Sequence, residues 1–301
     1  MQILRKYIFV VLPLVLLATG STFAAPQTGS DVPLLVETEW VEGNLGSSRL
    51  LLVDFGRSYQ DYLGGHIPGA VFLDRKVVWD TVDGLNGMLP PEDSVVQVFR
   101  EVGIDSEGTV VIYDAAAGLW ASRLFWALEY FGHGDVHILN GGWNSWQQQG
   151  NRVHRGAEKK PRGTFTPKIR PDLLATKEWL LQNFDDQNTV VVDARSKKEY
   201  TGKDARSKRG GHIPGSVNID WVLNITGDES KTFLSDIELA EMYDSLDVTK
   251  DREAVTLCQT GVRAAHSYFV LRLLGYPKVR MYDGSWEEWG NASETPIQAG
   301  E

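Results

Sequence analysis

The sequence contains a single cysteine among its 301 residues, Cys258. One thiol rules out any disulfide within the chain. An exposed lone thiol is also open to oxidation and cross-linking outside the cytosol. Cys258 is therefore either a small buried hydrophobic residue or a reactive group retained for its chemistry, and its surroundings must distinguish the two.

Positive charge is also scarce. The 30 Lys and Arg residues face 40 Asp and Glu residues, which gives a formal net charge of -10. Nucleic acid is not an expected partner, because a protein that binds it needs a basic surface to displace counterions from phosphate. Because the chain as a whole is negatively charged and repels anions, an anionic substrate has to be attracted by a local group of Arg or Lys side chains.

After its N-terminal segment, the sequence has no long apolar run. In that segment, Arg5 and Lys6 precede the apolar run Tyr7–Leu17, and small residues follow around Ala24. The run is short for a bilayer span, so the pattern predicts a cleaved secretory signal over residues 1–24, with an uncleaved anchor as the alternative. We expect an exported protein, periplasmic or secreted, that is not attached to a membrane after cleavage.

A pattern of about 140 residues occurs twice, which is far longer than a solenoid repeat and indicates a duplicated domain. Residues 51–54 (Leu-Leu-Val-Asp) precede Gly-His-Ile-Pro-Gly at 65–69. Residues 190–193 (Val-Val-Val-Asp) precede the same five residues at 211–215. Each copy continues with an apolar strand and a helical run that ends at glycine, namely 110–114 with 119–131 and 254–258 with 262–274.

Within each copy, short apolar strands alternate with helical stretches, which predicts an α/β fold with a mainly parallel sheet flanked by helices. We expect an N-terminal domain over residues 31–150 and a C-terminal domain over 173–301. Residues 151–172 are interpreted as a linker, because this segment is rich in Pro and, from 151 to 171, holds seven Lys or Arg against one Glu. A solvated connector explains that charge better than substrate steering does.

The two copies differ where the central strand ends. The first has Asp114 there and the second has Cys258, which is followed by Gln259, Thr260, Gly261, Val262 and Arg263. A turn from strand to helix directs backbone N–H groups and the positive end of the helix dipole inward. Such a turn favours a thiolate at Cys258, Gly261 allows close approach of a ligand, and Arg263 adds a positive charge. We therefore predict that Cys258 is a nucleophile beneath a site for a small anion.

These motifs resemble those of tandem-domain rhodaneses, and the resemblance covers almost the whole sequence after the signal. The segments that carry it are the two Gly-His-Ile-Pro-Gly motifs, Met88-Leu89-Pro90, residues 111–114, residues 141–143, the Cys258 loop and residues 282–286. The resemblance implies two tandem rhodanese-like domains, of which only the second carries the catalytic Cys. It also implies transfer of a sulfane sulfur from a small anionic donor to a thiol or cyanide acceptor. No cofactor is implied, and we expect a monomer.

The loop after Cys258 matches neither of two subfamilies of the tandem-domain rhodaneses. Thiosulfate-type members have a basic pair at the positions of Gln259 and Thr260, whereas mercaptopyruvate-type members have Gly and Ser there. We predict that Arg263 supplies the missing charge, with Arg206, Lys208 and Arg209 as further candidates. Thiosulfate is the expected donor, and 3-mercaptopyruvate is the alternative.

His66 and His212 occupy the same position in the two repeated motifs, at a turn that enters a strand. That position favours a structural hydrogen bond for His212. His66 has a second possible role, since the resemblance implies that an N-domain His can reach the site between the domains. One cysteine and scattered histidines give no metal-ligand spacing, so the sequence predicts no metal site.

Two other functions remain open at this point. A Cys-dependent phosphatase would place five residues between Cys and Arg, whereas this loop has four, Gln259 to Val262. A non-catalytic sulfur carrier or binding module would be indicated by loss of the Cys, which is present. We rank both below a sulfurtransferase that forms a persulfide on Cys258.

Overall fold

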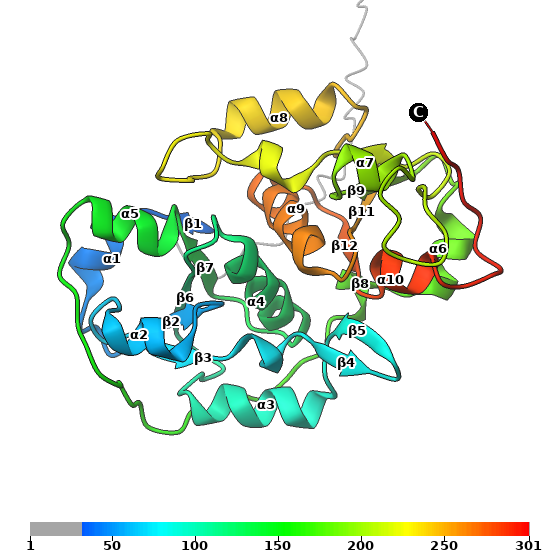
Figure 1. Ribbon diagram of the computed structural model, residues 1–301. Coiled ribbons are helices and arrows are strands. Elements are labelled where there is room, and N and C mark those ends of the chain that lie inside the picture. The colour runs from blue at the N-terminus through cyan, green and yellow to red at the C-terminus, as the bar shows by residue number, and fades with distance from the viewer. Residues whose placement is uncertain (1–31, 301) are drawn as a thin grey trace, which may run out of the picture.

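A computed structural model of the chain describes residues 32–300, and Figure 1 shows two lobes joined along a central seam. The predicted secretory signal lies outside the described residues. Among residues 32–300, no helix combines the length and apolar character needed to cross a membrane.

The first lobe is built on a five-stranded parallel sheet with the order β1-β7-β6-β2-β3. Its strands are β1 (Leu35–Val36), β2 (Leu50–Phe55), β3 (Val71–Leu73), β6 (Thr109–Tyr113) and β7 (Val136–Leu139). Its helices are α1 (Thr38–Asn44), α2 (Tyr59–Gly64), α3 (Glu92–Glu101), α4 (Leu119–Tyr130) and α5 (Gly142–Gln148). A small antiparallel hairpin, β4 (Asp80–Val82) and β5 (Leu85–Met88), extends from this lobe toward the other.

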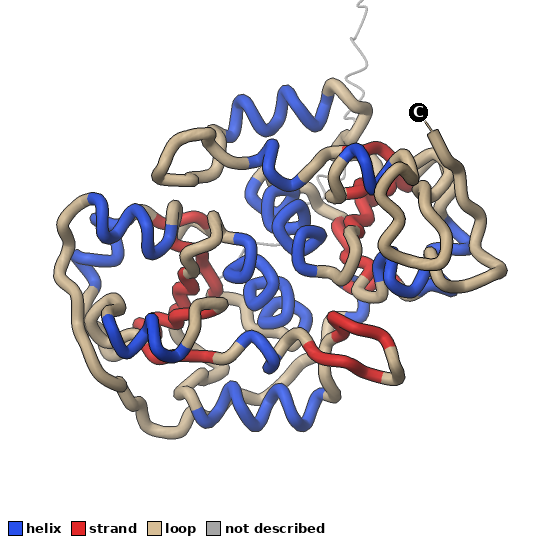
Figure 2. The backbone as a smooth tube through the Cα atoms, in the orientation of Figure 1, coloured by secondary structure: helices blue, strands red, loops and turns tan. Residues whose placement is uncertain are grey.

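The second lobe repeats the topology, with a parallel sheet of order β10-β9-β11-β12-β8. Its strands are β8 (Leu174–Ala175), β9 (Thr189–Asp193), β10 (Val217–Asn218), β11 (Glu253–Leu257) and β12 (Val279–Tyr282). Its helices are α6 (Lys177–Asn183), α7 (Lys197–Tyr200), α8 (Asp236–Asp244), α9 (Val262–Leu273) and α10 (Ser285–Trp289). Read in the reverse direction, β8-β12-β11-β9-β10, this order corresponds strand for strand to the order β1-β7-β6-β2-β3 of the first sheet. The expected α/β fold is confirmed, and Figure 2 shows strands enclosed by helices in both lobes.

Both faces of each sheet are covered, which explains why the strands read as continuous apolar runs. Because side chains alternate along a strand, Leu51 and Val53 face α3 and α4, whereas Leu52 faces α1 and α5. The face that carries α4 shares one core with the face of the second sheet that carries α9. The two lobes are therefore joined through a common hydrophobic interior.

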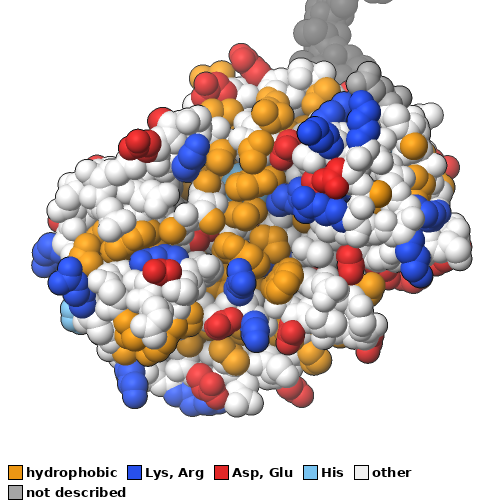
Figure 3. Space-filling model, viewed as in Figure 1, with side chains coloured by type: hydrophobic (Ala, Val, Ile, Leu, Met, Phe, Trp, Pro, Cys, Tyr) orange, Lys and Arg blue, Asp and Glu red, His pale blue; other side chains and the backbone are white. Residues whose placement is uncertain are grey.

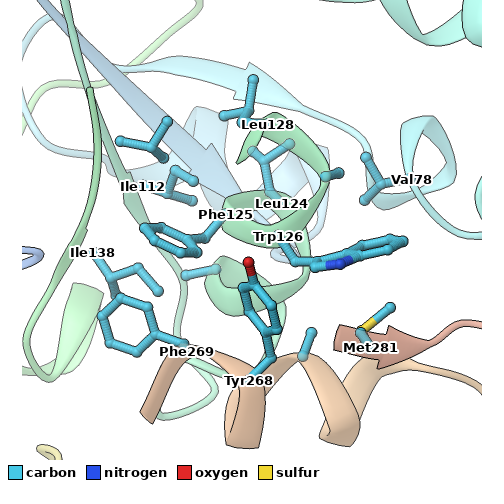
Figure 4. Packing of buried hydrophobic residues seen from close by; sticks show 14 of the residues in the cluster. Val78, Ile112, Leu124, Phe125, Trp126, Leu128, Ile138, Tyr268, Phe269 and Met281 are labelled. Carbon is cyan, nitrogen blue, oxygen red and sulfur yellow. The ribbon is translucent and has the colours of Figure 1, made fainter. Parts of the chain in front are cut away.

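Helices α4 and α9 form the main contact between the lobes, and they lie side by side in Figure 1. Phe125 and Trp126 of α4 face Tyr268 and Phe269 of α9, as Figure 4 shows. The rings of Phe125 and Phe269 meet edge to face, with centroids 4.9 Å apart. Figure 3 shows hydrophobic side chains along the same seam on one face of the molecule.

His266 of α9 is buried in this seam. Its Nε2 lies 3.1 Å from the carbonyl oxygen of Ala117 in the first lobe, and its Nδ1 lies 3.4 Å from the side-chain nitrogen of Asn224. The ring therefore carries its proton on Nε2 and uses Nδ1 as an acceptor. A second proton, on Nδ1, would place one N–H donor opposite another, the side-chain nitrogen of Asn224. Burial lowers the pKa of His266 to about 4.

We expect His266 to make the stability of the protein sensitive to acid. Between about pH 6.5 and pH 4 the unfolded chain binds a proton on this ring that the folded chain does not bind, so stability falls as the pH falls. Relative to His266→Gln, the wild type should lose about 2–3 kcal/mol of unfolding free energy between pH 7 and pH 4.5. Chemical denaturation of both proteins at the two pH values measures this, and a constant difference between them would contradict the assignment.

Candidate functional site

Cys258 follows β11, the central strand of the second sheet, at the carboxyl edge where open α/β sheets bind ligands. The residue is 1% exposed. Its backbone N–H donates to Ser285 Oγ at 3.2 Å, and its carbonyl oxygen accepts from the N–H of Trp286 at 2.9 Å. Contacts from the start of α10 thus fix the backbone that carries the thiol.

The loop after Cys258 turns sharply into α9. Gly261 is the N-cap of that helix and has a φ of +79°, a conformation that L side chains rarely adopt. A Cβ at this position would lie 2.7 Å from Nη1 of Arg123 and 3.0 Å from Oδ1 of Asp283. Gly261 is therefore required both by the turn and by the close packing of an ion pair. Helix α9 begins at Val262, so its first N–H groups flank the loop.

Arg263 is held by a carboxylate that sequence reasoning missed. Its two terminal nitrogens lie 2.7 and 2.8 Å from the oxygens of Glu199. Burial alone would raise the pKa of Glu199, but Arg263 and the capping residue Ser196 lower it to about 2. Burial alone would also lower the pKa of Arg263, whereas Glu199 and the nearby Cys258 raise it above its ordinary value. Arg263 therefore lies beside the Cys258 loop as half of a bidentate ion pair, and its positive charge is partly balanced by Glu199.

The corresponding turn of the first lobe holds a carboxylate. Asp114 follows β6, and its side chain is 1% exposed. Its two carboxylate oxygens accept four backbone N–H bonds of 2.8–3.0 Å. The donors are Ala116, Gly118, Trp120 and Ala121. Despite these bonds, burial raises the pKa of Asp114 above its usual value. The first copy thus uses its turn as an anion cradle and fills it with its own side chain.

The first lobe also supplies part of the wall around the second turn. Arg123 of α4 is fully buried and donates to the carboxylate of Asp283 at 2.7 Å, directly against Gly261. The same guanidinium donates to the carbonyl oxygens of Val78 and Gly87 at 2.9 Å each. One side chain therefore ties the β4–β5 region to the loop that carries Cys258.

The hairpin packs closely on Thr260. A Cβ at Gly87 would lie 2.6 Å from Cβ and from the carbonyl oxygen of Thr260, and 2.8 Å from Nε1 of Trp79. That indole N–H is buried and lacks a hydrogen-bond partner within the described part of the chain. Asn86 also reaches Glu287 of α10 at 3.1 Å. Cys258 and Thr260 thus lie where the first lobe closes over the second.

The other predicted site residues are placed as follows. Gln259 is buried, and its amide nitrogen donates to Ser207 Oγ at 3.1 Å and Glu287 Oε2 at 3.3 Å. Arg206 is half exposed, and its Nε lies 3.5 Å from Oε1 of Glu199, the oxygen that also accepts from Arg263. It therefore belongs to the edge of the Arg263 ion pair.

Arg209 is bonded to the C-terminal segment, and the Lys208 side chain is exposed. The Arg209 guanidinium donates to the carbonyl oxygens of Trp289, Ala292 and Thr295, so it secures the C-terminal segment. The prediction that Arg209 supplies charge to the substrate site was wrong, because a charged loop residue can donate to backbone carbonyls as readily as it binds substrate. The backbone N–H of Lys208 donates to Asn291 at 2.9 Å.

His66 is likewise turned away from Cys258. Its ring is buried and stacks on Tyr62 with centroids 4.1 Å apart, and its Nδ1 lies 2.9 Å from the Tyr62 carbonyl oxygen. Its other ring neighbour is His154 of the linker. The expectation that His66 could reach across to the site is therefore wrong. His212 makes the predicted structural bond, with Nδ1 2.9 Å from the carbonyl oxygen of Tyr200.

Comparison with known proteins agrees with the duplicated architecture. The model of the "Rhodanese-like domain" family matches residues 37–149 and 176–292. The thiosulfate sulfurtransferase of Pseudomonas aeruginosa is 35% identical over 269 residues, which cover 89% of this chain and 98% of that relative. The sulfur carrier protein TtuD of Thermus thermophilus is 34% identical over 284 residues, covering 89% of this chain and 97% of TtuD.

Among solved structures, the anaerobic ergothioneine biosynthesis enzyme of Chlorobium limicola, in complex with trimethyl histidine, superposes with a TM-score of 0.77 at 25% identity. The match covers 89% of this chain and 70% of that enzyme. The family model accounts for both copies of the repeat, and full-length relatives exceed 30% identity. The chain belongs to the rhodanese-like domain family.

Proposed function

We propose that this protein is an exported thiosulfate sulfurtransferase that carries sulfur as a persulfide on Cys258. The observation that carries the proposal is the relation between the two turns. In the first, the carboxylate oxygens of Asp114 lie two bonds from Cβ and accept four N–H bonds. The outer sulfur of a persulfide on Cys258 also lies two bonds from Cβ. The second turn has three residues before its helix where the first has four, and we infer that it holds the outer sulfur much as the first holds a carboxylate oxygen.

The reaction proceeds in two displacements. The Cys258 thiolate attacks the outer sulfur of thiosulfate, and sulfite leaves with the electron pair of the broken S–S bond. An acceptor such as cyanide then attacks the outer sulfur of the persulfide, which releases thiocyanate and regenerates the thiolate. The N–H groups of the turn and the Arg263 guanidinium stabilise the anions on this path. The similarity to the Pseudomonas aeruginosa sulfurtransferase supports this assignment.

A sulfur-carrier role is a second candidate, because the chain is as similar to TtuD as to the sulfurtransferases. Both functions use the same persulfide and differ in the acceptor, which is a small nucleophile in one case and a protein or metabolite thiol in the other. Export of the protein follows from the predicted signal over residues 1–24 and remains part of the proposal.

Substitution of Cys258 by Ser should abolish sulfur transfer and leave the fold intact. An alcohol does not form a persulfide, and the chain has no second thiol to replace it. Thiosulfate:cyanide assays of Cys258→Ser should give no thiocyanate above the rate without enzyme, while its thermal midpoint stays near that of the wild type. Retained activity would refute the assignment of the nucleophile.

Arg263→Ala should lower kcat/KM for thiosulfate by about 10- to 100-fold, the expected effect of losing a hydrogen-bonded charge. The substitution also leaves the buried Glu199 carboxylate without its bidentate partner, with only the more distant Arg206 and the bonds from Ser196 beside it. Arg263→Ala/Glu199→Gln should therefore recover part of the loss, whereas Arg206→Ala, at the exposed edge, should have a smaller effect. An unchanged kcat/KM in Arg263→Ala would show that the charge comes from elsewhere.

Thiosulfate should be used in preference to 3-mercaptopyruvate, since the site is compact and Arg263 suits a small dianion. The rival donor would depend on Thr260, which could act as the polar residue that mercaptopyruvate enzymes place there. Steady-state kinetics with both donors, one acceptor and one preparation compare them directly. A higher kcat/KM for 3-mercaptopyruvate that is lost in Thr260→Val would reverse the preference.

A further inference from the structure

Two histidines are paired across the junction between the first lobe and the linker. The backbone N–H of His66 donates to the carbonyl oxygen of His154, and the reverse bond is also present, both at 2.9 Å. Residues that exchange both bonds in an antiparallel bridge project their side chains to the same side. The two imidazoles accordingly lie together, with ring centroids 5.3 Å apart.

The His66 ring has one nitrogen in use and one free. Nδ1 donates its proton to the Tyr62 carbonyl oxygen at 2.9 Å, so the lone pair is on Nε2. Nε2 is fully buried, and it has no hydrogen-bond partner among residues 32–300. Buried nitrogens without a partner are uncommon and costly in folded proteins. A lone pair fixed by a hydrogen bond from the other ring nitrogen to a carbonyl is the arrangement found in metal-binding histidines.

Glu158 completes the group from the linker. Its backbone N–H donates to the hydroxyl of Tyr62 at 2.9 Å, and its carboxylate bonds to Nδ1 of His154. The carboxylate side chain is 26% exposed and that of His154 is 51% exposed, so the group opens to solvent on one side. One ligand atom from each of the three residues lies within 4.8 Å of the other two.

The second lobe provides an internal comparison. His212 forms the same two-bond bridge with Gln298, and its Nδ1 bonds to the carbonyl oxygen of Tyr200, on which its ring stacks. The second copy thus keeps the histidine, the tyrosine and the bridge, but it has Gln298 in the place of His154. A structural role common to both lobes explains the histidine that both copies keep. It does not explain the imidazole of His154 and the carboxylate of Glu158, which the first copy has in addition.

We propose that His66, His154 and Glu158 form a binding site for a divalent transition-metal ion of the zinc class. Two imidazole nitrogens and one carboxylate oxygen are ligands that Zn²⁺ prefers, and three protein ligands leave a fourth position for water. Bond lengths of about 2.0–2.2 Å place tetrahedral ligands about 3.4 Å apart. Rotation of the exposed His154 side chain closes the ligands to this spacing, and the metal replaces the proton that now joins His154 to Glu158.

The ion would fasten the linker to the first lobe. His66 belongs to the lobe, whereas His154 and Glu158 belong to the segment that leads to the second domain. Because none of the three contacts the Cys258 loop in the described part of the chain, the site acts independently of sulfur transfer. Metal binding should therefore raise stability according to the free metal concentration.

The test uses the mature chain carrying Cys258→Ser, since this removes the one thiolate that could compete for metal. Calorimetric titration with Zn²⁺ should give one ion per chain. His154→Gln and Glu158→Gln in the same background should each weaken binding at least tenfold, whereas Lys159→Gln, at an exposed neighbouring position, should not. Co²⁺ should give visible absorption bands of low-symmetry coordination in the parent and not in His154→Gln.

His154→Gln should fold normally, because Gln298 occupies the equivalent bridge position in the second lobe. Without metal its thermal midpoint should match the parent, and Zn²⁺ should raise the midpoint of the parent alone. The absence of stoichiometric binding to the parent, or equal Zn²⁺ affinity in the parent and His154→Gln, would overturn the proposal.

Discussion

The packing of α4 against α9 is the contact on which the rest of the molecule depends. It joins the two cores, and buried polar residues of both helices bond across it, including Glu129 of α4, which accepts from Tyr268 and Arg272 of α9 at 2.8 and 2.9 Å. Arg123 of α4 lies against Gly261 and bonds to Asp283, while His266 of α9 bonds to the carbonyl oxygen of Ala117. Buried polar groups must be satisfied, so these bonds fix the lobes in one relative position. The turn that bears Cys258 is therefore held by contacts from both domains.

Under the proposed function, duplication has given the protein two versions of one anion cradle, with four loop residues before the helix in the first and three in the second. In the first lobe the cradle is filled by Asp114, and in the second it begins with Cys258. The chain as a whole is negatively charged, so the second cradle depends on local charge to receive an anion. In the proposed function Arg263 provides that charge, and the bidentate bond to Glu199 orients the guanidinium while it reduces the electrostatic field that an anion would experience.

Much of the fold was predictable because the repeat and the apolar strands are local patterns. The helices predicted from 119 and from 262 begin at those residues in the structure, and Cys258 follows its strand as expected. The partners of the site were not predictable in the same way. Arg123 and Glu199 lie far from Cys258 in sequence, and only the packing of the lobes and the position of α7 bring them to the loop. Arg209 was selected for its charge, which does not reveal whether a guanidinium faces a substrate or backbone carbonyls.

We infer that the turn beginning at Cys258 holds a persulfide sulfur much as the first turn holds a carboxylate. The most direct test is the mass of the intact mature protein after incubation with thiosulfate and removal of excess donor. The protein should gain about 32 Da, one sulfur atom, located on the peptide that contains Cys258 and discharged by cyanide. An unchanged mass, or a gain that cyanide does not remove, would contradict it.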